Sequence, residues 1–272
     1  MPTSDGPRQG LHEGAPLALA VDEVRLSMKY FSRVLTTAPL LCFVLASFSA
    51  PASALEPFVA NYQIFNEGKP LGEATMQVVP DANPSHWRID LDMRGTRGLM
   101  GLANVNAQQS TVFDVLGDGI YRPLSQSTVR KAIFVGRKMT GTYDWSTHTA
   151  RWTGDVKKKR QEPVPLKDGD MSGLLINLAI IRDAQPGKTL DYRFVDNGRA
   201  RDHHFTVAQE LEPVTVDGMG FNAMRVSRVQ GSNNDETVVW VVEGVPTPVR
   251  ILQRENGADT YDLRLVDYKG AP

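Results

Sequence analysis

Two neighbouring histidines, His203 and His204, follow Asp202 and form the densest group of side chains that could bind a metal or exchange protons. Successive residues of a strand point to opposite faces, so two adjacent imidazoles do not easily reach one metal ion. Asp202 and His204 share a face, but a structural zinc ion needs four ligands. The sequence therefore predicts no metal site and no cofactor, and we interpret the three residues as polar positions beside a turn.

A second group with reactive side chains is the segment Asp170-Met171-Ser172-Gly173. A serine hydrolase needs a serine, a histidine and an acid held together, and its nucleophile elbow carries a glycine shortly before the serine. That glycine is absent here. We therefore interpret Asp170 and Ser172 as capping residues of a helix and predict no catalytic residue.

Two residues near the carboxyl end are candidates for ligand contact, namely Arg250 and Trp240. Arg250 alternates with Val249 and Ile251 in a strand-like segment, where it could pair with an acid inside the fold or recognise a ligand. Trp240 belongs to a set of aromatic and methionine residues on the apolar sides of strands. Such residues pack cores, but they could also line a cavity for an acyl chain.

The chain has one run of positive charge, Lys157 to Arg160, and a net charge of −1 overall. A near-neutral protein has no electrostatic footprint for nucleic acid or for anionic lipid. We interpret the run as a solvated hairpin or edge strand, where lysines discourage aggregation. Contact with anionic lipid head groups is the alternative.

The elements that must position these residues begin after a leader. Residues 28–54 have a basic start, an apolar run from Val34 to Phe48 and the ending Ala52-Ser53-Ala54, which are the three parts of a secretory signal peptide. Cleavage between Ala54 and Leu55 is expected, and the protein is predicted to be periplasmic or secreted. A membrane anchor is the alternative, but the run is shorter than the roughly 20 residues that span a bilayer.

Two further features bear on the leader. Residues 1–27 have no clear pattern, and we interpret them as an upstream extension before a start at Met28. Cys42, the single cysteine, lies in the apolar run behind Leu41, where lipidation is not expected. After cleavage the chain would have no cysteine and therefore no disulfide. Removal of the apolar run would also leave no stable transmembrane anchor.

Strict alternation of apolar and polar residues dominates positions 55–272. Phe58, Ala60, Tyr62 and Ile64 share one face, and the segment 86–94 repeats the pattern. A period of two with one apolar face is typical of antiparallel strands. Asn-Gly and Asp-Gly pairs supply the turns between successive strands. Residues 238–242 are apolar throughout, which indicates a strand covered on both faces.

One segment breaks this rhythm. Residues 171–184 are apolar nearly all round and are followed by Pro186-Gly187, which predicts a helix buried against the sheet. We expect a single domain over 55–272: a mainly β, antiparallel, rolled or barrel-like sheet with this one buried helix.

Several segments together resemble a known family. These are the secretory start, the helix opening at Asp170–Leu175, the Pro186–Leu190 entry to a strand, and the ending Val238–Val241 with Pro248-Val249-Arg250-Ile251. They are similar to an exported bacterial family known as domain of unknown function 3108, over residues 55–268. The resemblance implies a spirally rolled sheet and no established activity, substrate or catalytic residue.

Three functions follow as hypotheses. The first is a non-enzymatic envelope protein that binds an apolar ligand or a protein partner. The second is an interaction module that adds a strand at a sheet edge. The third is a hydrolase of wall or lipid substrates, which would require Asp170, Ser172, His203 or His204 to meet at one pocket.

Overall fold

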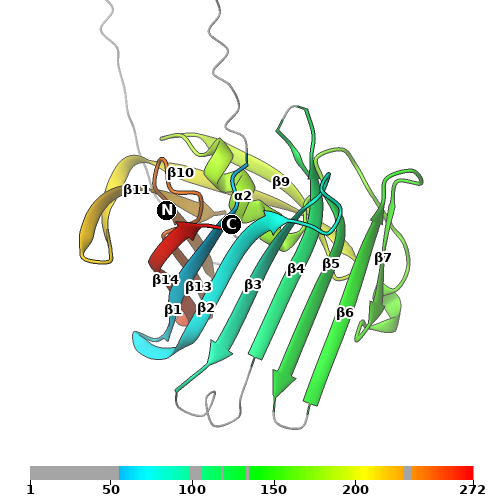
Figure 1. The fold of residues 1–272 in the computed structure, drawn as a ribbon, viewed down its shortest axis with the longest axis horizontal. Coiled ribbons are helices and arrows are strands. Elements are labelled where there is room, and N and C mark those ends of the chain that lie inside the picture. The colour runs from blue at the N-terminus through cyan, green and yellow to red at the C-terminus, as the bar shows by residue number, and fades with distance from the viewer. Residues whose placement is uncertain (1–54, 98–105, 118, 133–134, 230–234, 272) are drawn as a thin grey trace, which may run out of the picture. The chain divides into compact units, whose positions relative to one another are not determined.

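A computed structural model describes residues 55–97, 106–117, 119–132, 135–229 and 235–271. The predicted leader, the cleavage position between Ala54 and Leu55, and Cys42 are outside the described residues or at their boundary, and stay predictions. No described helix is both long and apolar enough to cross a membrane. The described part is built on one antiparallel sheet, as Figure 1 shows.

Fourteen strands form this sheet in the described part of the chain. They are β1 (Phe58–Asn66), β2 (Lys69–Pro80), β3 (Trp87–Gly95), β4 (Asn106–Val115), β5 (Tyr121–Ala132), β6 (Val135–Asp144), β7 (Thr149–Gly154), β8 (Val164–Pro165), β9 (Thr189–Asp196), β10 (Arg199–Val216), β11 (Met219–Arg228), β12 (Glu236–Val241), β13 (Arg250–Glu255) and β14 (Ala258–Gly270). Their order across the sheet is β8-β7-β6-β5-β4-β3-β2-β1-β14-β13-β12-β11-β10-β9. Each strand pairs with its sequence neighbour, except that β1 also pairs with β14 and β8 is separated from β9.

The predicted alternation is confirmed in the strands. Every second residue of β1 from Phe58 to Ile64 is buried, and the residues between them are partly exposed. The turns carry the residues that adopt a positive φ angle, as at Asn197-Gly198 and Asn256-Gly257. In β12, Val238 to Val241 are all buried, as expected for a strand covered on both faces.

The single described α-helix, α2 (Gly173–Asp183), lies inside the rolled sheet. It contacts β9 on one side and β3, β4 and β5 on the other, and buries Leu175, Ile180 and four more residues. The predicted helix is therefore confirmed, but it begins at Gly173 because Met171 forms a parallel bridge with Phe194 of β9. Ser172 occupies the N-cap position of α2, as predicted, but its hydroxyl makes no capping bond and instead bonds to Thr111 (3.0 Å). Asp170 does not cap the helix, because its carboxylate accepts hydrogen bonds from the Lys167 amide and Arg193.

The segment that joins β8 to α2 closes the roll. β8 pairs with β7, the end of one half of the sheet, and Met171 bonds to Arg193 and Val195 of β9, the end of the other half. Tyr143 of β6 donates to the Val195 carbonyl oxygen (2.7 Å), so β9 lies against the inward face of β6. We call Thr111, Gln126, Tyr143, Asp170, Ser172 and Arg193 the seam. Both ends of the sheet are engaged there, as a spiral roll requires.

The antiparallel order brings alternate connections to one end of the sheet. The turns β1–β2, β9–β10 and β13–β14 lie at this end, together with the last residues of β3 and β5 and the first residues of β4 and β6. In Figure 1 the ends of β3 and β5 and the starts of β4 and β6 lie at the bottom of the view. We call this end of the sheet the hairpin end, and it carries the candidate site.

Candidate functional site

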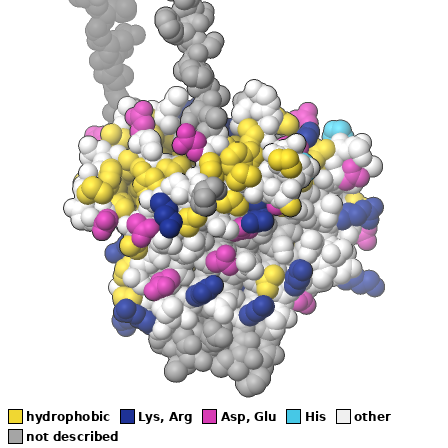
Figure 2. Space-filling view, viewed as in Figure 1, with side chains coloured by type: hydrophobic (Ala, Val, Ile, Leu, Met, Phe, Trp, Pro, Cys, Tyr) yellow, Lys and Arg dark blue, Asp and Glu magenta, His cyan; other side chains and the backbone are white. Residues whose placement is uncertain are grey.

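Six cationic side chains gather where four adjacent strands terminate. They are Arg94 and Arg97 at the end of β3, Arg130 and Lys131 at the end of β5, and Arg137 and Lys138 at the start of β6. All six are exposed. Figure 2 shows Lys and Arg side chains below the hydrophobic region of the visible face, with Asp and Glu side chains among them, whereas hydrophobic side chains gather over the upper part. We call these six residues the basic strand ends.

The basic strand ends have acidic neighbours, such as Asp92 near Arg94, but form no described ion pair. Within the described residues, none of the six forms an ion pair, although 13 ion pairs occur elsewhere. Glu73 lies opposite Arg94 in the β2–β3 register without pairing with it, and Asp155 accepts a hydrogen bond from the Lys138 backbone amide. Arg130 and Arg137 lie directly opposite each other across β5 and β6. The arrangement therefore leaves an excess of positive charge in solvent.

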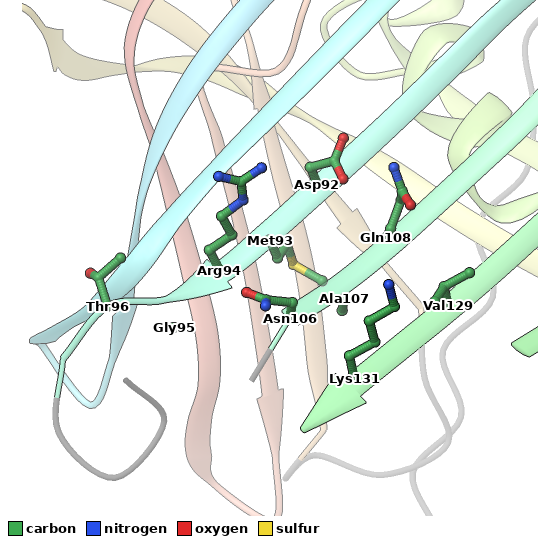
Figure 3. Close-up of a pocket in the computed structure, with 10 residues that line it drawn as sticks. All are labelled: Asp92, Met93, Arg94, Gly95, Thr96, Asn106, Ala107, Gln108, Val129 and Lys131. Carbon is green, nitrogen blue, oxygen red and sulfur yellow. The ribbon is translucent and has the colours of Figure 1, made fainter. Parts of the chain in front are cut away.

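A polar pocket of about 440 Å³ opens among these strand ends, on the outward face of the sheet. Figure 3 shows Arg94 and Asp92 of β3, Gln108 of β4 and Lys131 of β5 around it. The other lining residues are Met93, Gly95, Thr96, Asn106, Ala107 and Val129. The pocket therefore presents two cations and two side-chain amides, which are hydrogen-bond donors for a phosphate or carboxylate group.

Asp92 is the single carboxylate of this pocket. Partial burial raises its pKa, as does the neighbouring Asp90, while Arg94 and a hydrogen bond from Gln108 act in the opposite direction. No histidine, cysteine or serine lines the pocket. Its chemistry is thus suited to binding, and it lacks the paired groups of an acid–base site.

A second pocket, of about 360 Å³, contains several residues singled out by the sequence. Asp170, Asp202 and His204 line it, together with Asp191 and Arg193. His204 contacts Asp191 through Nδ1 (2.5 Å), and Asp170 accepts hydrogen bonds from Arg193 and the Lys167 amide. No described group of three or more His, Cys, Asp or Glu residues could hold a metal ion.

The catalytic grouping required by the hydrolase hypothesis is not assembled at this pocket. Ser172 does not line it and bonds instead to Thr111. His203 points to the opposite face of β10 from His204 and is 9% exposed. The structure therefore brings Asp170 and His204 together, but neither Ser172 nor His203 joins them.

The ligand candidates Arg250 and Trp240 are part of a dense network. Arg250 forms two hydrogen bonds to the buried Asp262 (2.7 and 2.9 Å), and its guanidinium lies 4.6 Å from the centre of the Trp240 ring. Trp240 in turn donates to Glu212 (2.7 Å). Asp262 is on the opposite face of β14 from the core residue Leu263, so this acid is outside the roll. These contacts account for Nε and Nη2 of Arg250 and for Nε1 of Trp240.

The lysine run adopts a different structure from the one predicted. Residues 158–160 form a short 3₁₀ helix, η1 (Lys158–Arg160), after β7, and no described hairpin or edge strand contains them. The reason is that β7 ends at Gly154, which has a positive φ angle and no room for a Cβ atom beside the Lys138 carbonyl.

Sequence reasoning missed the basic strand ends. The ends of β3 and β5 and the start of β6 contribute only two basic residues each, and two basic residues beside a turn do not by themselves indicate a binding site. The available signal was the pairing of consecutive strands, which would have brought positions 94, 130 and 137 to one edge.

Comparisons with known proteins bear on the whole roll. The model of a family described as a protein of unknown function, DUF3108, matches residues 59–264. No curated protein matches the chain. The structure is similar to a β-barrel-like protein of domain of unknown function DUF1849 from Brucella abortus, with 10% identity, a TM-score of 0.49, and coverage of 80% of this chain and 99% of that one. A DUF1089 family protein from Pseudomonas aeruginosa has 12% identity, a TM-score of 0.35, and coverage of 66% and 88%.

Proposed function

The chain belongs to the DUF3108 family of proteins of unknown function, and we propose that it is an exported, non-enzymatic envelope protein that attaches to anionic lipid head groups through its basic strand ends. The observation that carries the proposal is the gathering of six exposed, unpaired cations at the ends of β3, β5 and β6.

The charge distribution supports a surface as the partner. The whole chain has a net charge of −1, so the positive charge at the ends of β3, β5 and β6 is balanced by acids elsewhere, including Glu67 and Glu255 in other turns of the hairpin end. Such a protein turns its basic end toward an anionic surface. Each Lys or Arg near a membrane of anionic lipid contributes about 1 kcal/mol of attraction. Six such groups suffice for reversible attachment.

The predicted export supports anionic lipid as the source of the negative charge. A leader at residues 28–54 would deliver the protein to the periplasm or the exterior, where nucleic acid is not an expected partner. Bacterial envelope lipids carry phosphate head groups, and arginine side chains bind phosphate oxygens through paired N–H donors.

Other binding modes have less support. The inward face of the roll is filled by α2 and by core residues such as Met76 and Leu175, and both described pockets are lined mostly by polar residues. Neither of these two pockets is suited to an acyl chain. Strand addition needs a free edge, but β8 covers part of β7 and Met171 bonds to β9.

The proposal is tested by vesicle co-sedimentation of the mature protein. A variant with Arg94→Gln, Lys131→Gln and Arg137→Gln should bind phosphatidylglycerol vesicles on the order of 100-fold more weakly. The matched control carries Arg151→Gln, Lys188→Gln and Lys269→Gln, three exposed cations outside the hairpin end, and should lose less than about threefold. Equal losses in both variants, or equal binding to neutral phosphatidylcholine vesicles, would contradict attachment through the basic strand ends.

A further inference from the structure

Three nitrogen-rich side chains share the inward face of the sheet near the hairpin end. Arg201 and His203 of β10 lie opposite Phe194 and Tyr192 of β9, and Arg228 of β11 lies opposite Phe205 of β10. Directly paired residues share a face. All three side chains therefore belong to the face that carries the buried aromatic rings, and Arg228 is diagonal to His203.

Aromatic contacts fix two of these side chains. The His203 ring stacks on Phe194 with 5.0 Å between ring centres and an angle of 25°. The Arg201 guanidinium lies 5.0 Å from the centre of the same Phe194 ring. Because one rigid ring supports both groups, they are held beside each other without a hydrogen bond between them.

Polar atoms of this group lack partners. His203 Nε2 and Arg228 Nε are buried and have no hydrogen-bond partner in the described part of the chain. A buried donor left without a partner costs about 1–3 kcal/mol. Neither Arg201 nor Arg228 forms an ion pair with a described carboxylate, whereas Arg225 of the same strand pairs with Glu236.

The surrounding positive charges also act on this group of three side chains. Burial, Arg228 and Arg201 together lower the pKa of His203 to about 4, so its imidazole is neutral at pH 7. Burial lowers the pKa of Arg201 and Arg228, and Arg199 and Arg160 add further repulsion at Arg201. Two acids offset this repulsion only in part: Asp196 acts on Arg201, and Asp202, on the opposite face of β10, acts on His203, but neither forms an ion pair with the group.

Two guanidinium groups and a neutral imidazole suit one class of ligand. Paired guanidinium N–H groups bind phosphate oxygens, and an imidazole N–H adds a further donor. A bound oxyanion would satisfy the two orphaned nitrogens and neutralise the mutual repulsion of the arginines. We propose that Arg201, His203 and Arg228 form a binding site for a phosphate group.

The phosphate could be a free ion or the head group of a lipid. The site lies at the same end of the sheet as the basic strand ends, but it uses other residues. Arg94, Lys131 and Lys138 are on the outward face, whereas Arg130 and Arg137 share the inward face with the site. It therefore does not depend on the proposed membrane attachment, and its test uses no vesicles.

Isothermal titration calorimetry with inorganic phosphate, and in a separate arm with dihexanoyl phosphatidic acid below its micelle concentration, tests the site. Arg228→Gln and Arg201→Gln should each weaken binding at least about tenfold. Arg225→Gln is the matched control, because it removes an arginine from the opposite face of β11 and should change the affinity less than about twofold. Proton NMR should also show that phosphate raises the pKa of His203 in the wild-type protein.

Binding of both probes, lost in the Arg228→Gln and Arg201→Gln variants, supports a free phosphate site. Binding of the lipid probe alone, with the same losses, supports a head-group site. Absence of binding in both arms, or equal losses in Arg225→Gln, overturns the proposal. The same holds if phosphate leaves the His203 pKa unchanged, since a merely structural arginine pair would not alter that value.

Discussion

The seam and the hairpin end both contain polar side chains, but they use them in opposite ways. At the seam, Thr111 bonds to Ser172, and Tyr143 bonds to Gln126 and to the Val195 carbonyl. At the hairpin end, the basic strand ends have no described ion pair, and His203 and Arg228 have orphaned nitrogens. Most polar groups of the seam are satisfied by the chain itself, although Asp170 Oδ1 is buried without a described partner. At the hairpin end the orphaned nitrogens of His203 and Arg228 lie among unpaired positive charges, and we infer that a partner binds there.

The largest expected effect comes from the helix that the seam encloses. Leu175 is fully buried in α2, and Leu175→Ala should lower the free energy of unfolding by about 3–4 kcal/mol because it leaves a cavity. Urea denaturation measures the change. The affinity of the folded fraction for phosphate should stay the same. A parallel loss of affinity would contradict the claim that the core and the hairpin end act independently.

The next effect concerns the seam ion pair. Asp170 is 1% exposed and bonds to Arg193, which is itself partly exposed. Asp170→Asn should lower the free energy of unfolding by about 2 kcal/mol, less than for a fully buried pair, because water reaches the guanidinium. Arg182→Gln, which breaks a more exposed pair with Asp183, should cost under about 1 kcal/mol. Equal losses of unfolding free energy in the two variants would show that the seam ion pair is no stronger than the more exposed pair.

Acidification should weaken the fold through His203. Its pKa is about 4 in the folded protein against 6.5 in the unfolded chain, so the unfolded chain binds the proton first as the pH falls. The stabilisation is complete above pH 6.5 and is lost between pH 6.5 and 4, by up to about 3 kcal/mol. Urea denaturation across this range should be flatter for His203→Gln. An unchanged slope in that variant would assign the loss to other groups.

The fold was largely predictable because its signals are local. Alternation in residues 58–64 and turn pairs such as Asn256-Gly257 depend on near neighbours, and the apolar run in residues 171–184 is long enough to identify a helix. The first residue of the helix was harder to predict, because the bridge between Met171 and Phe194 is a tertiary contact. Alternation also predicted correctly that His203 and His204 face opposite ways.

The candidate site was not predictable from the same signals. Arg94, Arg130 and Arg137 become neighbours only through the order of strands in the sheet. The net charge of −1 does not reveal such a local cluster of positive charge. The run Lys157–Arg160 is easy to see in the sequence because its four residues are adjacent. Adjacency in the sequence does not show which residues meet on the surface of a folded sheet. The orphaned nitrogens of His203 and Arg228 depend on side-chain packing, which no pattern in the sequence encodes.

The smallest expected effect on stability tests the comparison between the seam and the hairpin end most directly. Arg130 and Arg137 lie directly opposite each other on β5 and β6, and like charges in that position destabilise a sheet. Arg137→Gln should therefore raise the free energy of unfolding by about 0.3–0.5 kcal/mol at low salt, and the gain should vanish near 1 M salt, where screening is strong. Arg254→Gln is the contrast, because Arg254 pairs with Glu236 and Asp259 and its loss should destabilise the protein.

The same Arg137→Gln variant should bind phosphatidylglycerol vesicles about fivefold more weakly, in line with the loss of one cation near the membrane. Opposite signs for stability and binding would mean that the repulsive arginine pair is retained for contact with a partner at a small cost to the fold. If Arg137→Gln lowered the stability instead, the arginine would be a structural residue like those of the seam, and the distinction between the two regions would fail at this position.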